Sequence, residues 1–170
     1  LLDENGAVAV DARFVVSYPK PSTDPYNHLA IHPYPIHLIS EEQLNDGTDI
    51  IIRPIRPEDA EIEQAFIRGL SAESKYFRFM NSIHELSLEM LVRFTQIDYH
   101  NEMALVAINP DPAGEEEIGV CRYMTNPDKR TCEFAIVVAD KWQGKGIARL
   151  LMQKLLEIAR NRNLEVMEGQ

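Results

Sequence analysis

The sequence is short of cysteine, of long apolar runs and of any leader-like start. Its two cysteines, Cys121 and Cys132, form no CxxC pair, so the reducing cytosol is the expected setting. No apolar run approaches the roughly 18 residues that a membrane-spanning helix requires. The first residues also lack the basic and apolar regions of a secretory leader. Together these absences predict a cytoplasmic protein without a membrane partner.

Basic residues are scarce relative to acidic ones. Lysine and arginine number 17 against 27 aspartate and glutamate residues, which gives a formal net charge of −10. Nucleic-acid binding depends on clustered lysine and arginine, so no nucleic-acid partner is expected. Hydrophobic residues make up 45% of the 170 residues, which is enough for one packed domain with an appended segment.

The chain changes character near residue 47. Residues 1–18 include a valine-rich, strand-like stretch, and five prolines then fall between Pro19 and Pro35. Because proline fixes φ and removes a backbone donor, residues 19–47 are predicted to form an extended linker with little regular structure. Turn residues at its end separate this linker from the predicted main domain, residues 48–170.

Regular apolar spacing in the main domain predicts an alternation of strands and helices. Strands are predicted at 49–53, 102–108, 117–124, 131–138 and 164–167, and helices from Pro57, from Ser87 and from Ile147. The short connection at 126–129 predicts an antiparallel hairpin between its flanking strands. The predicted fold class is therefore α/β, with a mixed, mostly antiparallel sheet flanked by helices.

The most distinctive local feature is segment 143–148, between a predicted strand and a long helix. Glycines at 144 and 146 permit φ > 0 and the close approach of a ligand. The first turn of the helix adds N–H groups with a partial positive charge, so the segment can bind a phosphate or pyrophosphate. The same pattern is also typical of a plain tight connection. The segment has neither the GxxxxGK[ST] nor the GxGxxG pattern of nucleotide-binding loops.

What the segment does match is the motif Q/R-x-x-G-x-G/A, through Gln143, Gly146 and Ala148. This motif and the residues before it, 133–142, resemble those of GCN5-related N-acetyltransferases, the GNAT family. The resemblance runs from about residue 49 to the end and implies the GNAT (acyl-CoA N-acyltransferase) fold, with acetyl-CoA as cosubstrate and no metal. It also implies that the chain stops before the last helix and strands of that fold, where a tyrosine often acts as general acid.

The resemblance assigns roles in binding acetyl-CoA. It implies that the pyrophosphate binds the backbone amides of Gln143, Gly144, Lys145, Gly146, Ile147 and Ala148. The pantetheine arm is expected to pair with the end of the preceding strand, at Ile136, Val137 and Val138. The Val138 N–H is then placed to donate to the thioester oxygen, as an oxyanion hole.

Glu133 is the predicted catalytic base, because an ammonium group must lose a proton before it can attack. Strand alternation places Glu133, Ala135 and Val137 on one face, and members of the GNAT family often carry a catalytic glutamate at this point. The alternative is a structural carboxylate paired with Arg122 across the hairpin. Glu102 is a weaker candidate for substrate contact, with capping or solvent exposure as its alternative.

Further stretches resemble bacterial fusions in which an ADP-forming acyl-CoA synthetase-like region precedes the acetyltransferase. Residues 70–79 and 98–107 resemble that acetyltransferase domain. Residues 6–13 resemble the closing strands of an ATP-grasp domain, where Asp11 would help to hold magnesium, and 28–35 resemble the linker. The implied activity is N-acetylation of a protein lysine, with an acyl-CoA synthetase as a candidate partner. A small-amine acetyltransferase and a non-catalytic acetyl-CoA-sensing module stay open as alternatives.

The remaining candidates are weaker. His28 and His32 have an H-x3-H spacing, but no cysteine or acidic ligand lies at a spacing that would complete a zinc site. Trp142 is predicted to pack beside the loop. Three aromatic residues are predicted to lie in the core, with the lining of a substrate cleft as the alternative: Tyr76, Phe77 and Phe79.

Overall fold

The computed structural model describes residues 2–3, 6–7, 32–111 and 114–169. The chain divides into two units, Leu1–Ala30 and Ile31–Gln170. Of the first unit, only an antiparallel pair is described, formed by β1 (Leu2–Asp3) and β2 (Gly6–Ala7). Asp11 and His28, and with them most of the expected ATP-grasp-like region, lie outside the described residues.

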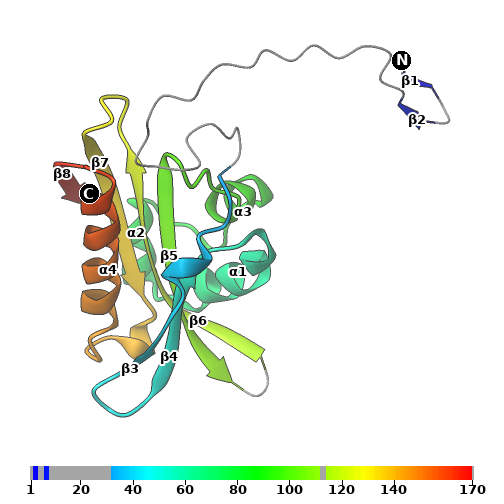
Figure 1. Cartoon of the computed structure of the whole chain (residues 1–170). Coiled ribbons are helices and arrows are strands. Elements are labelled where there is room, and N and C mark those ends of the chain that lie inside the picture. The colour runs from blue at the N-terminus through cyan, green and yellow to red at the C-terminus, as the bar shows by residue number, and fades with distance from the viewer. Residues whose placement is uncertain (1, 4–5, 8–31, 112–113, 170) are drawn as a thin grey trace. The chain divides into compact units, whose positions relative to one another are not determined.

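One six-stranded sheet, in the order β3-β4-β5-β6-β7-β8, forms the centre of the second unit (Figure 1). Neighbouring strands are antiparallel except β7 and β8, which run parallel. The strands are β3 (Ser40–Gln43), β4 (Asp49–Pro54), β5 (Glu102–Asp111), β6 (Gly114–Thr125), β7 (Thr131–Val138) and β8 (Val166–Gly169). This topology confirms the mixed, mostly antiparallel sheet, including the hairpin of β6 and β7.

In the described part of the chain, four α-helices flank the sheet, and their first residues explain where they begin. They are α1 (Ala60–Gly69), α2 (Ala72–Phe79), α3 (Leu88–Thr95) and α4 (Ile147–Asn161). A single 3-10 turn, η2 (Pro57–Asp59), leads into α1, as proline and acidic residues in a first turn favour. Ser71 and Ser87 cap α2 and α3 by accepting backbone N–H bonds. Figure 1 shows α4 on one side of the sheet and α1 and α3 on the other.

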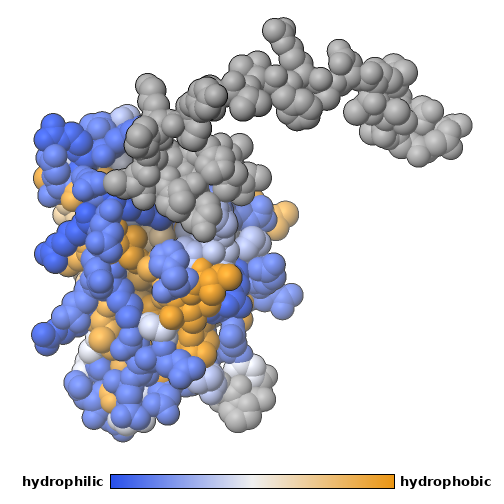
Figure 2. Space-filling model, viewed as in Figure 1, coloured by the Kyte–Doolittle hydropathy of each residue, from blue (hydrophilic) through white to orange (hydrophobic). Residues whose placement is uncertain are grey.

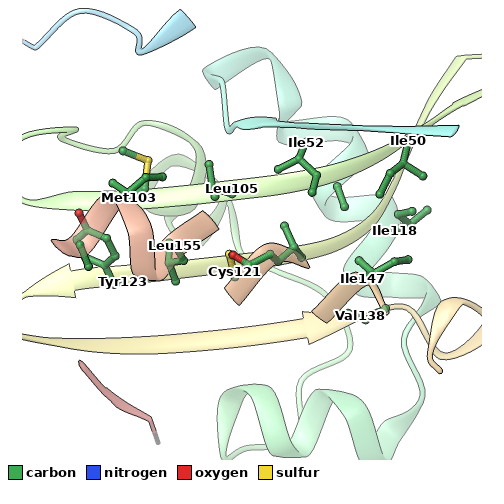
Figure 3. Packing of buried hydrophobic residues seen from close by; sticks show 14 of the residues in the cluster. Ile50, Ile52, Met103, Leu105, Ile118, Cys121, Tyr123, Val138, Ile147 and Leu155 are labelled. Atoms are coloured by element: carbon green, nitrogen blue, oxygen red, sulfur yellow. The ribbon is translucent and has the colours of Figure 1, made fainter. Parts of the chain in front are cut away.

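Each face of the sheet carries its own hydrophobic core. On the α4 face, Leu151 and Leu155 pack among buried strand residues such as Leu105 and Cys121 (Figure 3). On the opposite face, the α1 residues Phe66 and Ile67 pack with residues of β5, β6 and β7. Since both faces are covered, the central strands read as continuous apolar runs.

The alternation predicted for β7 is confirmed by these cores. Cys132 and Val138 belong to the core on the α4 face. Val137 belongs to the core on the opposite face, the α1-face core. Odd-numbered residues of β7 therefore point toward the α1–α3 face, as the period of two in a strand requires. Glu133 consequently lies on that face.

The structure differs from the prediction in the stretch expected to be linker. Strand β3 lies within residues 19–47 and pairs with β4 along its whole length, and Leu44 after it is buried. The four residues of β3 read Ser-Glu-Glu-Gln, and half of them are exposed. An edge strand with polar residues gives no hydrophobic alternation, so the sequence pattern could not reveal it.

A second difference concerns α2, a helix that the sequence pattern did not predict. Tyr76 and Phe77 lie on α2 with 53% and 64% of their surfaces exposed, so their prediction as core residues is wrong. Phe79 is partly buried against the α1-face core, as predicted. The last strand also begins two residues later than predicted, at Val166.

The outer surface is mainly polar. The face drawn in Figure 2 is largely hydrophilic, with a smaller apolar area near its middle. Within the described residues, none of the helices combines the length and apolar character that crossing a membrane requires.

Candidate active site

The outer edge of β7 is open over its second half. Strand β8 pairs with β7 only from Thr131 to Phe134, whereas β6 pairs with β7 as far as Val138. The Ala139 N–H donates to Ile118 of β6, and alternate amides along a strand point to opposite sides. The N–H groups of residues 136 and 138 therefore point to the open edge, where an extended ligand can pair with them.

The segment after β7 combines two glycines in the left-handed region with an uncapped helix start. A 3-10 turn, η3 (Asp140–Trp142), is followed by Gly144 at φ 77° and Gly146 at φ 91°. Gly146 is the N-cap of α4 and supplies no side chain to bind the first-turn amides. The first helical bond runs from the Leu150 N–H to the Gly146 carbonyl. The N–H groups before it are thus oriented along the helix start, as an anion-binding site requires.

Lys145 and Gln143 order this loop. The Lys145 ammonium lies 2.7 Å from the Asp46 carboxylate in the β3–β4 turn and 4.8 Å from the centre of the Trp142 ring. Hydrogen bonding to Lys145 is the main cause that lowers the pKa of Asp46. Gln143 donates through Nε2 to the Val138 carbonyl oxygen at 3.2 Å. Trp142 packs against the α4-face core, as predicted.

The start of α2 is attached to the same loop through Asp140. The Asp140 carboxylate accepts hydrogen bonds from the Ser71 N–H at 2.8 Å, the Ser71 hydroxyl at 2.7 Å and the Ser74 hydroxyl at 2.9 Å. These bonds, that of the Ser71 N–H first, lower the pKa of Asp140. Strand β7, the glycine loop and α2 are thereby held together.

Glu133 lines a pocket of about 140 Å³ on the α1–α3 face of the sheet. In the register, Glu102 and Glu133 both lie opposite Met124, so the three side chains form one row on one face. Burial raises the pKa of Glu102, whereas Glu133 is exposed. The other charged side chains around the pocket are arginines: Arg78, Arg93 and Arg122.

Arg122 binds a different carboxylate, that of buried Glu63 on α1, at 3.6 Å. Its guanidinium also lies 4.4 Å from the centre of the Phe94 ring. Glu63 in turn lies beside Glu117 of β6, which is 3% exposed. Burial first, and then the charge of Glu63, raise the pKa of Glu117 well above its ordinary value. This buried pair escaped sequence reasoning because Glu117 ends a run of three glutamates that resembles a solvated surface.

A larger pocket of about 440 Å³ lies beside this pair, between α1 and the residues around η3. Lys141 at its rim forms an ion pair of 2.6 Å with Glu116. Within the described part of the chain, no three histidine, cysteine or acidic side chains are grouped closely enough to hold a metal ion.

Comparison with known proteins gives consistent matches. Residues 70–169 match the acetyltransferase (GNAT) family. Acetyltransferase PA5475 of Pseudomonas aeruginosa is 38% identical over 126 residues, which are 74% of this chain and 68% of that protein. Among solved structures, the GNAT domain of S. lividans PAT is 32% identical with a TM-score of 0.70, over 78% of this chain and 77% of that one. A cAMP-binding acyltransferase from Mycobacterium smegmatis shares the fold, at 23% identity and a TM-score of 0.52, over 79% of this chain and 39% of its own.

Proposed function

Because this chain belongs to the acetyltransferase (GNAT) family, we propose that it transfers the acetyl group of acetyl-CoA to the ε-amino group of a protein lysine. The observation that carries the proposal is the arrangement around β7. Its open edge and the glycine loop suit an extended, pyrophosphate-bearing cosubstrate. The pocket with Glu133 lies on the α1–α3 face of the same strand, and suits an amine.

The cosubstrate is proposed to bind through the backbone. The amides of residues 143–148 hold the pyrophosphate, and their two positive-φ glycines leave open space beside the chain. The pantetheine arm pairs with Ile136, Val137 and Val138 as an added strand, which main-chain hydrogen bonds favour. Acetyl-CoA supplies the activated acetyl group.

The acceptor amine attacks the thioester carbonyl from the Glu133 side. The Val138 N–H donates a hydrogen bond to the oxygen that becomes negative, which stabilises the tetrahedral intermediate. Glu133 accepts the proton of the attacking amine. Val138 follows Glu133 by five positions along the strand, about 16 Å between Cα atoms, so the proton reaches Glu133 through water. The C–N bond then forms, the C–S bond breaks and the CoA thiolate leaves.

The acceptor pocket also restricts the substrate. At about 140 Å³ it is smaller than typical ligand pockets of roughly 300–1,000 Å³, so it suits an amine-bearing side chain. Its carboxylates attract an ammonium group. An acyl-CoA synthetase is the candidate protein substrate, on the strength of the resemblance of 70–79 and 98–107 to synthetase-linked acetyltransferases.

Calorimetric titration with acetyl-CoA tests the proposed binding site. The wild type should bind, and Gly146→Glu should abolish binding because its side chain and charge occupy the pyrophosphate position. Gly114→Glu is the matched control, since Gly114 also has a positive φ and open space around it but lies at the start of β6, outside the glycine loop. Equal loss in both variants would contradict a specific loop site.

Turnover measurements then distinguish a protein lysine acetyltransferase from a small-amine acetyltransferase and from a sensing module. Lysine peptides and small amines are supplied with acetyl-CoA, and the release of CoA is measured. Faster turnover of peptides supports the proposal, whereas faster turnover of small amines supports a small-amine acetyltransferase. Binding of acetyl-CoA without turnover of any acceptor supports the sensing module.

A further inference from the structure

Arg78 holds a distinctive position in the proposed acceptor pocket. It lies in the last turn of α2 and lines the pocket that Glu133 and Glu102 also line. Its half-buried guanidinium lies 5.0 Å from the centre of the Phe79 ring and 5.8 Å from that of Phe94. These rings hold the charged end of the side chain within the pocket wall.

The other two arginines of the pocket each have a hydrogen-bonding or ion-pair partner among the described residues. Arg122 is ion-paired with Glu63, and Arg93 contacts the Met124 sulfur at 3.9 Å while its charge acts on Glu102. Arg78 forms neither a hydrogen bond nor an ion pair with any residue in the described part of the chain. The carboxylate whose charge acts on it is Glu63, which Arg122 already binds.

An arginine in this setting favours an anion from outside. Burial, followed by the charge of Arg122, lowers the pKa of Arg78 to about 10, so the guanidinium is still charged at neutral pH. A partly desolvated cation without a counterion is unfavourable. A bound carboxylate would balance the charge of the guanidinium. A guanidinium can hold a carboxylate through two parallel hydrogen bonds.

We infer that Arg78 binds a carboxylate of the acceptor, so that the preferred substrate is a lysine with an acidic residue beside it. This inference rests on the proposed function and names the substrate class for the same pocket. Glu102 and Glu133 line the same pocket, where their charges attract the ammonium group of that lysine. The pocket thus offers acidic groups for the amine and one arginine for the neighbouring acid.

Paired acceptors test the inference with the wild-type protein alone. Two lysine peptides differ only in the residue beside lysine, which is Glu in one and Gln in the other, and kcat/KM is measured at saturating acetyl-CoA. The Glu peptide should be preferred by about ten- to hundredfold, the range of a hydrogen bond to a charged group. A second pair, Nα-acetyl-lysine and its amide, shows whether the carboxylate comes instead from the α-carboxylate of a small substrate.

Variants assign the preference to Arg78. Arg78→Gln should lower kcat/KM for the Glu peptide by a larger factor than for the Gln peptide, so that the preference is lost, whereas Arg78→Lys should keep part of the preference. Arg160→Gln, on the exposed last turn of α4, is the control for a lost arginine charge. Melting curves and acetyl-CoA affinity verify that each variant is folded.

Each outcome is decisive. Equal rates for the two peptides with the wild type would overturn the inference and leave the proposed function standing. Equal losses on both peptides in Arg78→Gln would show that Arg78 only supports the fold. If Arg78→Gln does not fold, Arg78→Lys and the wild-type preference decide the question. Acetyl-CoA binding without acetylation of any acceptor would remove the proposed function and this inference with it.

Discussion

Glu133 and Glu117 lie on the same face of the sheet in opposite surroundings. Glu133 is exposed at a pocket, whereas Glu117 is 3% exposed and lies beside a second carboxyl group, that of Glu63. A solvent-accessible carboxylate can exchange protons with a substrate, and a buried one is held neutral by desolvation. The two residues therefore give different predictions.

Glu133→Gln should lower kcat for acetylation by about 10²- to 10⁴-fold, the usual contribution of a general base. The dissociation constant of acetyl-CoA should not change, because the glycine loop is intact. Glu102→Gln is the matched comparison from the same row of side chains, and its main effect should be on KM. Steady-state kinetics with a lysine peptide measure both variants. A similar kcat for Glu133→Gln and the wild type would exclude Glu133 as the base.

Glu117→Gln should stabilise the fold increasingly as pH rises. Burial and the charge of Glu63 raise the pKa of Glu117 above its ordinary value of 4.5, with the charge of Arg122 opposing and that of Asp59 reinforcing the shift. A raised folded-state pKa means that the stabilisation from the neutral carboxyl is complete below the unfolded pKa and is lost as pH rises through the folded one.

Glutamine is neutral at every pH, so the free energy of unfolding of Glu117→Gln should exceed that of the wild type by a growing margin. The margin should increase above pH 4.5 by at most about 1.4 kcal/mol per pH unit. Urea denaturation of both proteins from about pH 5 to pH 8 measures it. A margin that is constant over this range would contradict a neutral Glu117.

At the scale of elements, the serine caps of α2 and α3 differ in their hydrogen-bond partners. Ser71 accepts the Ser74 N–H at 3.1 Å and also donates to Asp140, whereas Ser87 accepts the Met90 N–H at 3.2 Å. The Ser71 hydroxyl thus connects α2 to the turn that precedes the glycine loop. Among the described residues, the Ser87 hydroxyl bonds only within α3.

Ser71→Ala and Ser87→Ala should each cost about 1 kcal/mol of stability from the lost cap. Ser71→Ala should cost about 1 kcal/mol more for its hydrogen bond to Asp140 and should also weaken acetyl-CoA binding, because the loop loses a support. Denaturant titration and calorimetry distinguish the two effects. Equal acetyl-CoA affinities in the two variants would show that α2 does not position the loop.

At the scale of the whole molecule, the boundary of the domain lies well before residue 48. Unit Ile31–Gln170 contains the entire six-stranded sheet and both cores. Strand β3 covers the edge of β4, and Leu44 is 4% exposed. A chain that begins after Leu44 leaves that edge unpaired and removes a buried leucine.

A protein of residues 31–170 should therefore unfold in one cooperative transition, and the full chain is the reference for its stability. A protein of residues 48–170 should be less stable by at least about 2 kcal/mol, the lower end for a lost buried leucine. Thermal and urea unfolding of the three proteins provide the comparison. Equal stability of the two shortened proteins would mean that β3 is an appended strand without energetic importance.

The sequence by itself determined much of the architecture. Apolar periodicity predicted β4, β5, β6, β7 and α4, because buried faces impose periods of two and 3.6 directly on the chain. The glycines at 144 and 146 predicted the loop, since φ values of 77° and 91° are rarely open to other residues. Polar β3 and partly exposed α2 left no such pattern, so they could not be predicted.

Only the tertiary structure decided which side chains meet. Glu63 of α1 lies beside Glu117 of β6, and Arg78 of α2 shares a pocket with Glu133 of β7. These pairs are more than 50 residues apart in the chain, and no local pattern encodes them. Local sequence sets backbone conformation and the buried face of each element, whereas contacts between elements depend on how the whole set of helices and strands packs.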